Sequence, residues 1–487
     1  MTFPQGRLYI NGVLRDAAGK ATYEDIGPWT GEVIGRAADA TAADMEEAIV
    51  AARRAFDKTD WPINHRLRHE VVTQLLQLFE VNRERLYEIM RHEVGAALGT
   101  IYGPQVELAL ENFGGLLEVF NKLQWEQDKG CATAFSIQSH RRIVREPVGV
   151  VGAITAWNVP LYMAIGKIVP ALLAGCCVIL KPAPETPLCG ALIGELAAQA
   201  GFPAGVFNVL TGKDPALLGE MLVTDPRVDM ITFTGSTAVG KRIAQKAAAT
   251  LKKVFLELGG KSALIVLDDA PDFAAAVGSS LCVYHAGQGC ATYTRLLVPR
   301  SRYEEVKFIL KASYQSYETM WGDFNEPTNV MGPLSSAKHR DRVMSYIEAG
   351  KAEGARLLHG GHVRTDKGGG FFVEPTCFVD VDNGMRIAQE EIFGPVLVVI
   401  PFEDDEDAIR IANDSVYGLA GAVVSADPER AMKVARRIRA GTFSINGGIA
   451  VGADVPFGGY KHSGYGREWG QAGFEEYLQT KTIAMRV

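Results

Sequence analysis

The sequence predicts an α/β protein whose core is a parallel sheet covered by helices on both faces. From about 149 to 267, short and continuous apolar runs alternate with segments of helical periodicity. Strands that are apolar at every position are buried on both faces, which is typical of parallel sheets built from βαβ units. With 487 residues, the chain is long enough for two or three domains rather than one.

Composition narrows the classes of function. A hydrophobic fraction of 47% and a net charge of −7 fit a globular protein that handles small molecules, and give no electrostatic reason to expect nucleic acid. The N-terminal residues hold no apolar stretch long enough for a signal peptide. The longest apolar run, 168–180, contains Pro170 and is shorter than the ~20 residues of a bilayer span. We expect no membrane association, and a cytoplasmic location as the default.

Helical patterns fill the first hundred or so residues. Thr41 and Asp44 fit a capping box that opens a helix over 44–56. Two further amphipathic stretches, roughly 66–92 and 105–123, also predict helices.

The alternating region predicts six strands and four helices. We expect strands at 149–156, 176–180, 206–210, 228–233, 254–258 and 263–267, and helices near 163–173, 188–200, 216–223 and 237–251. In such sheets, ligands bind beyond the carboxyl ends of the strands.

Two strand-like segments do not fit this alternation. The segments 132–145 and 476–487 are more polar than the central strands. An exposed strand edge favours unwanted pairing unless something covers it. These segments either pair across a subunit interface or form an ordinary hairpin on their own chain, and the pattern alone leaves both open.

The cysteines indicate a reduced protein without a metal site. Seven cysteines, with no C-x-x-C pair, disfavour a disulfide framework or a zinc site. Cys176 and Cys177 lie inside an apolar strand, where thiols behave as small hydrophobic groups. We expect Cys282 on a helix. Only Cys290 lies in a glycine-rich polar loop, 287–291, where it is either a nucleophile or a loosely packed thiol.

Two polar features follow predicted strands. Phe233 is followed by Gly235 and Ser236 at the start of a helix, where free N–H groups suit a phosphate. A plain turn with a serine cap explains the same pattern equally well. Lys181 ends another apolar strand and could bind ribose hydroxyls or a phosphate, although a solvated lysine is the more common explanation.

Glu257 and Asn158 are candidates for the chemistry itself. Glu257 interrupts an apolar strand just before two glycines, where burial would raise its pKa and make it a general base. The alternative is a carboxylate held by N–H groups of the glycine turn. Asn158 follows the strand at 149–156, where its amide could donate to an oxyanion or simply form a turn.

Taken in order, these motifs resemble the aldehyde dehydrogenase superfamily over nearly the whole chain. The matching stretches are 157–158, 181–182, 233–237, 257–261, 287–290, 391–395, 456–459, 463–468 and 476–482. The resemblance implies two Rossmann-like doubly wound domains and a small β oligomerisation region, in a homodimer or homotetramer. It places an NAD(P)-binding domain at 1–126 and 148–258, a catalytic domain at 259–462, and the oligomerisation region at 127–147 and 463–487.

The resemblance also implies a mechanism. The Cys290 thiolate attacks an aldehyde, while the Asn158 amide and the Cys290 backbone N–H hold the oxyanion. Hydride passes to the nicotinamide, and water activated by Glu257 hydrolyses the thioester. Lys167 and Glu468 match a secondary proton-relay pair.

Thirteen residues match cofactor-binding positions of the family. They are Ile154, Trp157, Lys181, Ala183, Pro184, Gly212, Phe233, Gly235, Ser236, Leu258, Gly259, Glu391 and Phe393. By resemblance, Lys181 binds the adenosine ribose, Ser236 the pyrophosphate and Glu391 the nicotinamide ribose, while Phe393 positions the ring. Many NAD-preferring relatives have a glutamate where this chain has Pro184. Here the glutamate, Glu185, comes one place later; NAD is still the expected cofactor despite this departure, and NADP is not excluded.

Nine positions correspond to the aldehyde tunnel of relatives. They are Val159, Tyr162, Met163, Gly166, Tyr284, Gly289, Ala291, Val451 and Phe457. None is charged, and Gly166 replaces what is often a bulky aromatic residue. An apolar, roomy pocket predicts a bulky hydrophobic or aromatic aldehyde.

Three other functions remain to be weighed. A CoA-acylating dehydrogenase would not need Glu257 to activate water. A cysteine hydrolase would pair Cys290 with His285, which lies only five residues away and has no evident orienting partner. A catalytically silent binding paralogue would not be expected to keep Cys290, Glu257 and Asn158.

Overall fold

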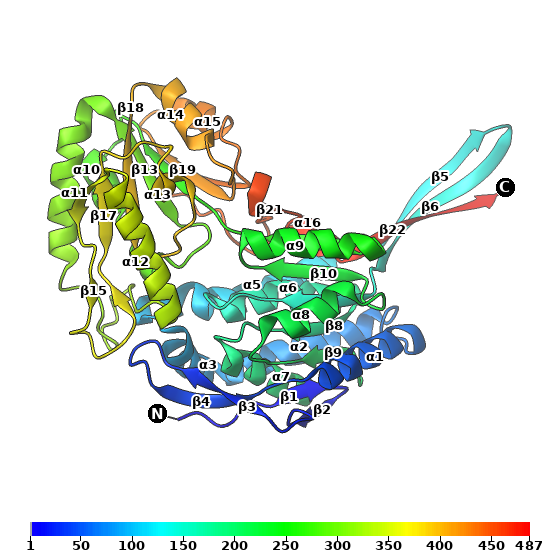
Figure 1. Ribbon diagram of the computed structural model, residues 1–487. Helices are drawn as coiled ribbons and strands as arrows, with labels where there is room; N and C mark the ends of the chain where they lie inside the picture. Colours follow the sequence, from blue (N-terminus) through cyan, green and yellow to red (C-terminus); the bar gives the residue numbers. More distant parts are fainter. Residues whose placement is uncertain (1) are drawn as a thin grey trace.

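The computed structural model describes residues 2–487 and contains two large helix-covered sheets with a smaller sheet projecting from one side (Figure 1). The predicted α/β class is therefore confirmed. In these residues, no helix is both long and apolar enough to cross a membrane.

The first sheet has eight strands. In spatial order they are β2 (Val13–Arg15), β1 (Leu8–Ile10), β9 (Phe207–Val209), β8 (Cys177–Lys181), β7 (Val150–Ile154), β10 (Met230–Thr234), β11 (Lys253–Glu257) and β21 (Gly464–Tyr465). The five from β9 to β11 are parallel, whereas β1, β2 and β21 join antiparallel. The chain runs from β7 outward through β8 to β9, then crosses back to β10. The strand order therefore reverses between β7 and β10.

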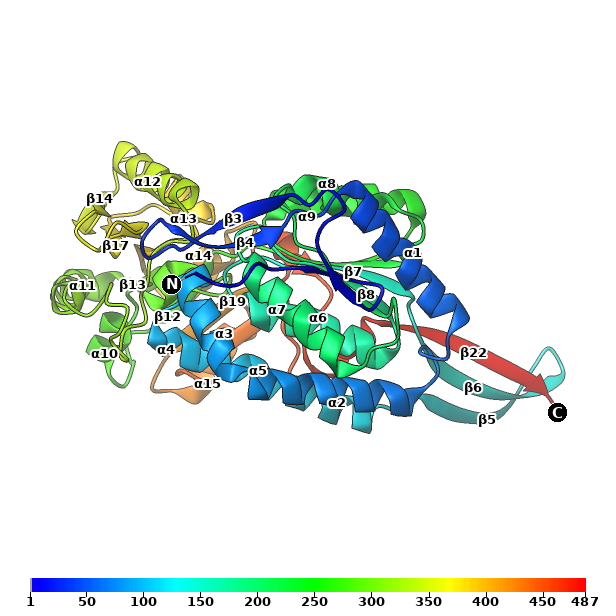
Figure 2. The ribbon, with the colours of Figure 1, turned by 90° about the horizontal axis from the view of Figure 1, so that it is seen from below.

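Helices cover both faces of this sheet (Figure 2). They are α1 (Ala42–Lys58), α2 (His65–Val81), α3 (Arg83–Ile89), α4 (Leu98–Thr100), α5 (Glu107–Lys122), α6 (Pro160–Ala174), α7 (Pro187–Ala200), α8 (Pro215–Thr224) and α9 (Thr237–Ala247). Helices α1, α8 and α9 form one layer, and α2, α5, α6 and α7 form the other. Five-residue π-helical turns follow α3 and α4, at Met90–Val94 and Ile101–Gln105.

Local signals account for several helix ends. The Asp44 N–H donates to Thr41 Oγ1 at 3.3 Å, and the Thr41 N–H donates to Asp44 Oδ2 at 2.8 Å, so the expected capping box opens α1. The single helix expected over 66–92 is wrong in detail. It breaks at Asn82, whose side chain donates to the carbonyl of Leu78 and ends α2.

The second sheet has seven strands. In spatial order they are β14 (Arg356–His359), β17 (Thr376–Val379), β18 (Val396–Phe402), β13 (Tyr293–Pro299), β12 (Ser262–Val266), β19 (Ala420–Val424) and β20 (Thr442–Ile445). Its helices are α10 (Phe273–Gly278), α11 (Tyr303–Tyr317), α12 (Ala337–Ala352), α13 (Arg386–Gln389), α14 (Asp405–Asn413) and α15 (Pro428–Ala435). All pairings are parallel except that of β14 with β17. Cys282, expected on a helix, lies beyond the end of α10 with a φ of 57°.

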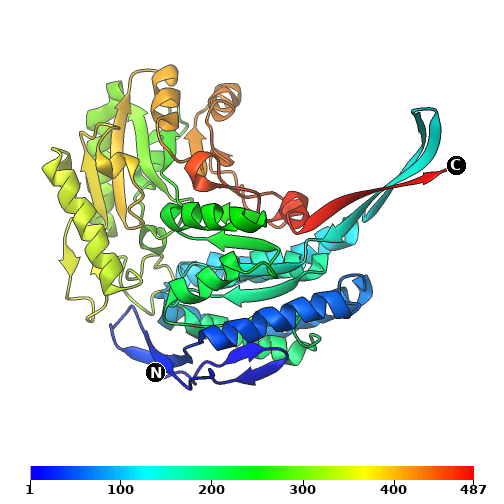
Figure 3. The ribbon, with the colours of Figure 1, turned by 45° about the vertical axis from the view of Figure 1, so that its right-hand side comes forward.

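The two segments that did not fit the alternation form one three-stranded sheet that projects from the body (Figure 3). Its strands are β5 (Glu126–Ala134), β6 (Ile137–Pro147) and β22 (Leu478–Arg486). The expected strand at 132–145 contains a turn, because Phe135 and Ser136 adopt positive φ angles. The hairpin pairs with the tail of its own chain, and residues 464–465 join the first sheet rather than this one. The remaining short elements are β3 (Thr22–Ile26), β4 (Val33–Ala38), β15 (Val363–Arg364), β16 (Phe372–Val373) and α16 (Gly470–Glu475).

Candidate active site

Two adjoining cavities open where the strand order of the first sheet reverses. The carboxyl ends of β7 and β10 meet there, as expected for a ligand site in a doubly wound sheet. The cavities measure ≈ 400 Å³ and ≈ 450 Å³ and share five lining residues. The shared residues are Ala156, Trp157, Thr234, Gly235 and Ser236. Together they form one elongated site that runs from the first sheet toward the second.

Twelve of the thirteen residues predicted to bind the cofactor line this site. The outer cavity is lined by Ile154, Trp157, Lys181, Ala183, Pro184, Phe233, Gly235 and Ser236, and the inner one adds Leu258, Gly259, Glu391 and Phe393. Gly212 is the exception, because it is buried behind Leu218. The twelve lining residues come from five different chain segments, which the fold brings together on this site, and Gly212 does not join them.

The outer cavity combines a buried cation with a helix start. Lys181 is only 2% exposed at the end of β8, and burial lowers its pKa to about 8. Ser236 caps α9 by accepting a hydrogen bond from the Val239 N–H at 3.4 Å. The capping role of Ser236 is therefore present, and the same helix start faces the cavity.

The inner cavity has an aromatic wall and an anchored carboxylate. The Trp157 ring packs edge-on against Phe393, with centroids 5.4 Å apart, and against His339 at 5.2 Å. Phe393 adopts a positive φ of 64°, which turns it toward this cluster. Glu391 is held because its Oε1 accepts a hydrogen bond from the Gly260 N–H at 3.0 Å.

Cys290 lies in a turn directly before β13 and lines the inner cavity. Five of the other cysteines are buried, and Cys131 is exposed on the projecting sheet. The surrounding burial, with a contribution from the Glu257 carboxylate, raises the Cys290 pKa to about 12. The resting group is therefore a thiol that must lose its proton before it can attack.

Glu257 ends β11 and lines the same cavity as Cys290. Its side chain is buried, and within residues 2–487 no side chain donates a hydrogen bond to either carboxylate oxygen; the Gly459 N–H interacts with it only weakly and lowers the pKa by less than burial raises it. Burial, followed by the charge of Glu468, raises the Glu257 pKa well above its usual value. The alternative of a carboxylate held by the glycine turn is thus not what the structure contains. A buried acid without a side-chain partner is costly and marks a functional group.

Asn158 supplies an amide to this cavity from the loop after β7. Its Nδ2 donates to the Gln288 carbonyl at 2.8 Å, two residues before Cys290. An amide carries two N–H donors, so a second one remains for a ligand oxygen. Cys290, Glu257 and Asn158 therefore meet on one cavity, although they come from three different segments.

Lys167 and Glu468 form a buried ion pair next to this cavity. The Lys167 Nζ and Glu468 Oε1 are 2.8 Å apart, and the two side chains are 0% and 5% exposed. Neither residue lines the inner cavity, but the charge of Glu468 acts on Glu257. The pair is thus placed behind the acid rather than on the ligand surface.

The expected widening at Gly166 is not present. A Cβ on Gly166 would lie 2.9 Å from Cζ2 of Trp469 and 3.0 Å from the carboxyl carbon of Glu468. The Trp469 indole fills the space and packs on Tyr162, with ring centroids 4.7 Å apart. The sequence could not predict that Trp469 fills this space, because Trp469 lies more than 300 residues further along the chain than Gly166.

The nine predicted tunnel positions do not line one cavity. Tyr284 and Ala291 line a separate cavity of ≈ 710 Å³ beside β13, and Val451 lies on an exposed loop. Met163 and Gly166 are buried inside α6. The remaining positions, Val159, Tyr162, Gly289 and Phe457, are partly exposed.

His285 is poorly placed to act as the base of a cysteine hydrolase. It is 4% exposed, does not line the cavity of Cys290, and has its pKa lowered to about 4 by burial. Its Nε2 faces Gln105 Nε2 at 3.4 Å rather than the thiol. The hydrolase alternative therefore lacks a suitable base here.

Sequence reasoning missed several residues of the site. His339, Lys338 and Arg342 come from α12 and line the inner cavity, and Arg342 donates to the carbonyls of Glu391 and Ile392. No motif surrounds them, so only their spacing on one helix, with Arg342 four residues after Lys338 and three after His339, could have connected them. Among the described residues, no group of three metal-ligating side chains is close enough to hold a metal ion.

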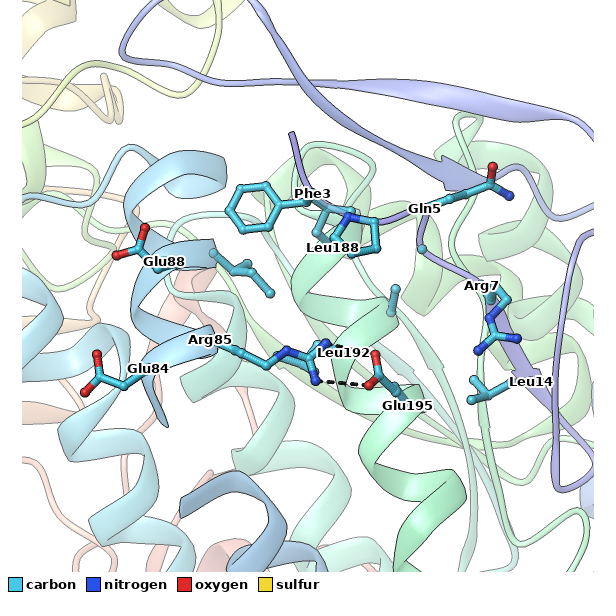
Figure 4. A pocket seen from close by; sticks show the side chains of 14 residues that line it. Phe3, Gln5, Arg7, Leu14, Glu84, Arg85, Glu88, Leu188, Leu192 and Glu195 are labelled. Carbon is cyan, nitrogen blue, oxygen red and sulfur yellow. Dashed lines mark hydrogen bonds and ion pairs between the residues drawn. The ribbon is translucent and has the colours of Figure 1, made fainter. Parts of the chain in front are cut away.

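A larger cavity lies away from this chemistry, between the N-terminal segment, α3 and α7 (Figure 4). It measures ≈ 660 Å³, and Arg85 crosses it to bond both oxygens of Glu195 at 3.0 Å. In the part of the chain that the structure describes, none of the predicted site residues lines it. Size alone therefore does not identify the active site.

Comparison with known proteins agrees with this geometry. The aldehyde dehydrogenase family model matches residues 14–483. The Mycobacterium tuberculosis aldehyde dehydrogenase complexed with NAD+ is 41% identical, with a TM-score of 0.94 over 100% of this chain and 99% of that one. A mutant of aldehyde dehydrogenase C from Pseudomonas syringae, complexed with NAD+ and octanal, is 39% identical, with a TM-score of 0.91 over 98% and 96%. Betaine aldehyde dehydrogenase from Staphylococcus aureus in complex with NAD+ is 38% identical, with a TM-score of 0.94 over 99% and 95%. The chain belongs to the aldehyde dehydrogenase family.

Proposed function

We propose that this chain oxidises a hydrophobic aldehyde to its carboxylic acid with NAD+, through a thioester on Cys290. The observation that carries the proposal is the meeting of Cys290, Glu257 and Asn158 on one cavity. A nucleophile, a buried base and an amide donor are the three groups that this reaction needs from the protein.

The residues divide the work as follows. The Cys290 thiol gives its proton to water, and its sulfur bonds to the aldehyde carbon. The carbonyl oxygen becomes an oxyanion that accepts hydrogen bonds from the Asn158 amide and the Cys290 N–H; when the C=O bond re-forms, the aldehyde hydrogen leaves as hydride and the thioester remains. Bound NAD+ supplies the hydride acceptor. Glu257, which has no side-chain hydrogen-bond donor within residues 2–487, takes a proton from the water that attacks the thioester. Hydrolysis by Glu257 favours this reaction over transfer of the acyl group to coenzyme A.

The site fits a dinucleotide. The two joined cavities give an elongated volume, with Lys181 in the outer cavity, Glu391 in the inner one and the start of α9 where the two meet. Lys181 and Glu391 suit the two ribose groups, and the Ser236 turn suits the pyrophosphate. The three related enzymes described above were all crystallised with NAD+.

A hydrophobic aldehyde is favoured by the surroundings of α6. Tyr162 and Trp469 form an aromatic pair there, on the side of α6 where Gly166 lies. The Pseudomonas syringae enzyme was crystallised with octanal. Because Trp469 fills the space beside Gly166, we expect an elongated substrate to be accepted more readily than a broad one.

The test is a panel of aldehydes assayed with NAD+ and NADP+ in parallel, with and without coenzyme A. We expect kcat/KM for octanal and benzaldehyde to exceed that for acetaldehyde and betaine aldehyde, with NAD+ preferred. A preference for betaine aldehyde would contradict the substrate proposal, and an absolute need for coenzyme A would contradict the hydrolytic step.

We also propose that the projecting sheet joins subunits into a homodimer or homotetramer. Phe135 at the hairpin tip is 98% exposed, and Met485 on β22 is 61% exposed. Exposed apolar groups on an uncovered sheet favour pairing with another chain. Phe135→Lys and Met485→Lys should lower the oligomer mass measured by light scattering. The matched control is Phe308→Lys on α11, where a phenylalanine that is 76% exposed lies on the body.

A further inference from the structure

A buried chain of amide and imidazole groups connects the proposed oxyanion donor to the nucleophile loop. Gln105 Nε2 donates to the backbone carbonyl of Asn158 at 2.8 Å and lies 3.4 Å from His285 Nε2. The side-chain amide of Asn158 donates to the backbone carbonyl of Gln288 at 2.8 Å. All four side chains are at most 4% exposed. Apart from Asn158, the members of this network lie outside the nucleophile, base and oxyanion groups already assigned.

The two ends of the network, Gln105 and Gln288, are each held in place by the surrounding backbone. Gln105 is the last residue of the π-helical turn Ile101–Gln105, a geometry often found at functional sites. Gln288 bonds through its amide to the carbonyls of His285 and Pro333, and accepts from the Ser335 N–H. The nucleophile loop is therefore fastened to 333–335, and Asn158 is fastened to the π-turn.

The backbone at His285 is held in an unusual conformation. His285 and Ala286 have φ angles of 49° and 52°, and Gly287 continues at 70°. Two consecutive non-glycine residues in the left-handed region need support from their surroundings. Support comes from the His285 N–H, which donates to the Val330 carbonyl at 2.7 Å, and from the Gln288 amide.

The orientation of Gln105 follows from its partners. Because the Asn158 carbonyl only accepts, Gln105 must present its NH₂ group there. His285 Nε2 lies 3.4 Å from this Gln105 Nε2, and Nδ1 of the ring has no hydrogen-bond partner within residues 2–487. The ring proton therefore belongs on Nε2, where it is directed at the backbone carbonyl of Asn158. Burial lowers the His285 pKa to about 4, so the neutral ring persists at neutral pH. An asparagine, whose amide can donate to the same carbonyl and which tolerates left-handed angles, could take the same place.

We propose that Gln105 and His285 are positioning residues that aim the Asn158 amide at the reacting oxygen. They touch neither substrate nor cofactor and act only through Asn158. The inference rests on the proposed role of Asn158 as oxyanion donor. An amide that is turned away by one network bond would no longer stabilise charge that develops only in the transition state.

A double-mutant cycle tests this directly. The variants of the full-length enzyme are Gln105→Leu, Asn158→Ala and their combination, assayed for kcat, KM and the NADH burst with octanal. Asn158→Ala should lower kcat about 10²–10³-fold. Gln105→Leu should lower kcat about tenfold with little change in KM, and should have almost no further effect in the Asn158→Ala background, because coupled residues are not additive.

Supporting variants separate positioning from folding. Gln105→Met offers a second isosteric change if Gln105→Leu does not fold. His285→Ala should lower kcat and His285→Asn should restore it, and Ala286 shows that alanine fits this backbone angle. The control is Asn208→Ala on β9, which removes a buried amide that donates to the Gly205 carbonyl and accepts from the Asn11 N–H. This variant should lower Tm but leave kcat unchanged.

The outcomes are distinguishable. An unchanged kcat in Asn158→Ala would refute the oxyanion role, and the positioning inference with it. If Asn158→Ala lowers kcat as expected, but Gln105→Leu lowers kcat by the same factor in the wild type and in the Asn158→Ala variant, only the positioning inference is overturned. An unchanged kcat in Gln105→Leu would overturn it as well.

Discussion

Lys167 on α6 and Glu468, 301 residues further along the chain, form an ion pair of 2.8 Å in the protein interior. The Lys167 ammonium also lies 4.9 Å from the centre of the Phe255 ring, and Glu468 N–H and C=O both bond Phe457 at 2.7 Å. The pair therefore connects the first sheet to the chain that returns from the second.

Removing one member should destabilise the fold strongly. Lys167→Met leaves a buried carboxylate without its partner, which costs about 3–5 kcal/mol in comparable cases. The double variant Lys167→Met with Glu468→Leu should recover much of that loss, measured by urea unfolding. The control is Glu70→Gln, which breaks the exposed pair with Arg66 and should leave Tm unchanged. Equal losses in the single and double variants would contradict this account.

The two glycines Gly166 and Gly114 should respond oppositely to alanine. In α6, a Cβ on Gly166 would meet Trp469 at 2.9 Å, so Gly166→Ala should cost about 1–3 kcal/mol through overpacking. In α5, no atom lies within 4 Å of a Cβ on Gly114, so Gly114→Ala should stabilise by about 0.5–1 kcal/mol. Thermal unfolding measures both, and stabilisation of the α6 variant would show that Trp469 moves aside.

Gly166 marks the limit of what the sequence could predict about this fold and its site. Apolar periodicity predicted the central strands and helices because local patterns determine whether a segment is buried. The order of motifs also grouped Cys290, Glu257 and Asn158, since each lies at the end of a strand or in a turn of a familiar fold. The shape of the substrate region could not be predicted, because Trp469 reaches Gly166 only through tertiary packing. Gln105 was missed for a similar reason, as its partners His285 and Asn158 are distant in sequence.

Cys290→Ala should abolish aldehyde oxidation and thioester formation, because no other thiol lines the cavity among residues 2–487. A chemical readout complements the assay. Because burial raises the Cys290 pKa to about 12, alkylation by iodoacetamide in a Cys131→Ser background should be slow at neutral pH and accelerate as the pH rises. Mass spectrometry identifies the modified residue. Fast alkylation of Cys290 at pH 7 would mean that the thiol is already activated without cofactor.

Glu257→Gln should separate the two half-reactions. The glutamine cannot take a proton from water, so we expect an NADH burst followed by slow turnover. In the wild type, burial raises the Glu257 pKa well above its usual value, so the carboxylate forms only as the pH rises through that raised pKa. The steady-state rate should therefore increase with pH over that window, and the increase should be absent in Glu257→Gln.

The raised pKa of Glu257 should also affect stability. As the pH rises, the rate should increase but the free energy of unfolding should fall. In this window the folded chain holds a proton on Glu257 that the unfolded chain has lost, so the free energy of unfolding falls as the pH rises. Glu257→Gln removes this loss and should be more stable than the wild type at pH 8 but not at pH 4, measured by urea unfolding. Glu374→Gln, at a partly buried carboxylate paired with Arg364, is the control and should not gain stability at pH 8. Gain of activity or loss of stability at high pH in Glu257→Gln would contradict the role of Glu257 as a buried base.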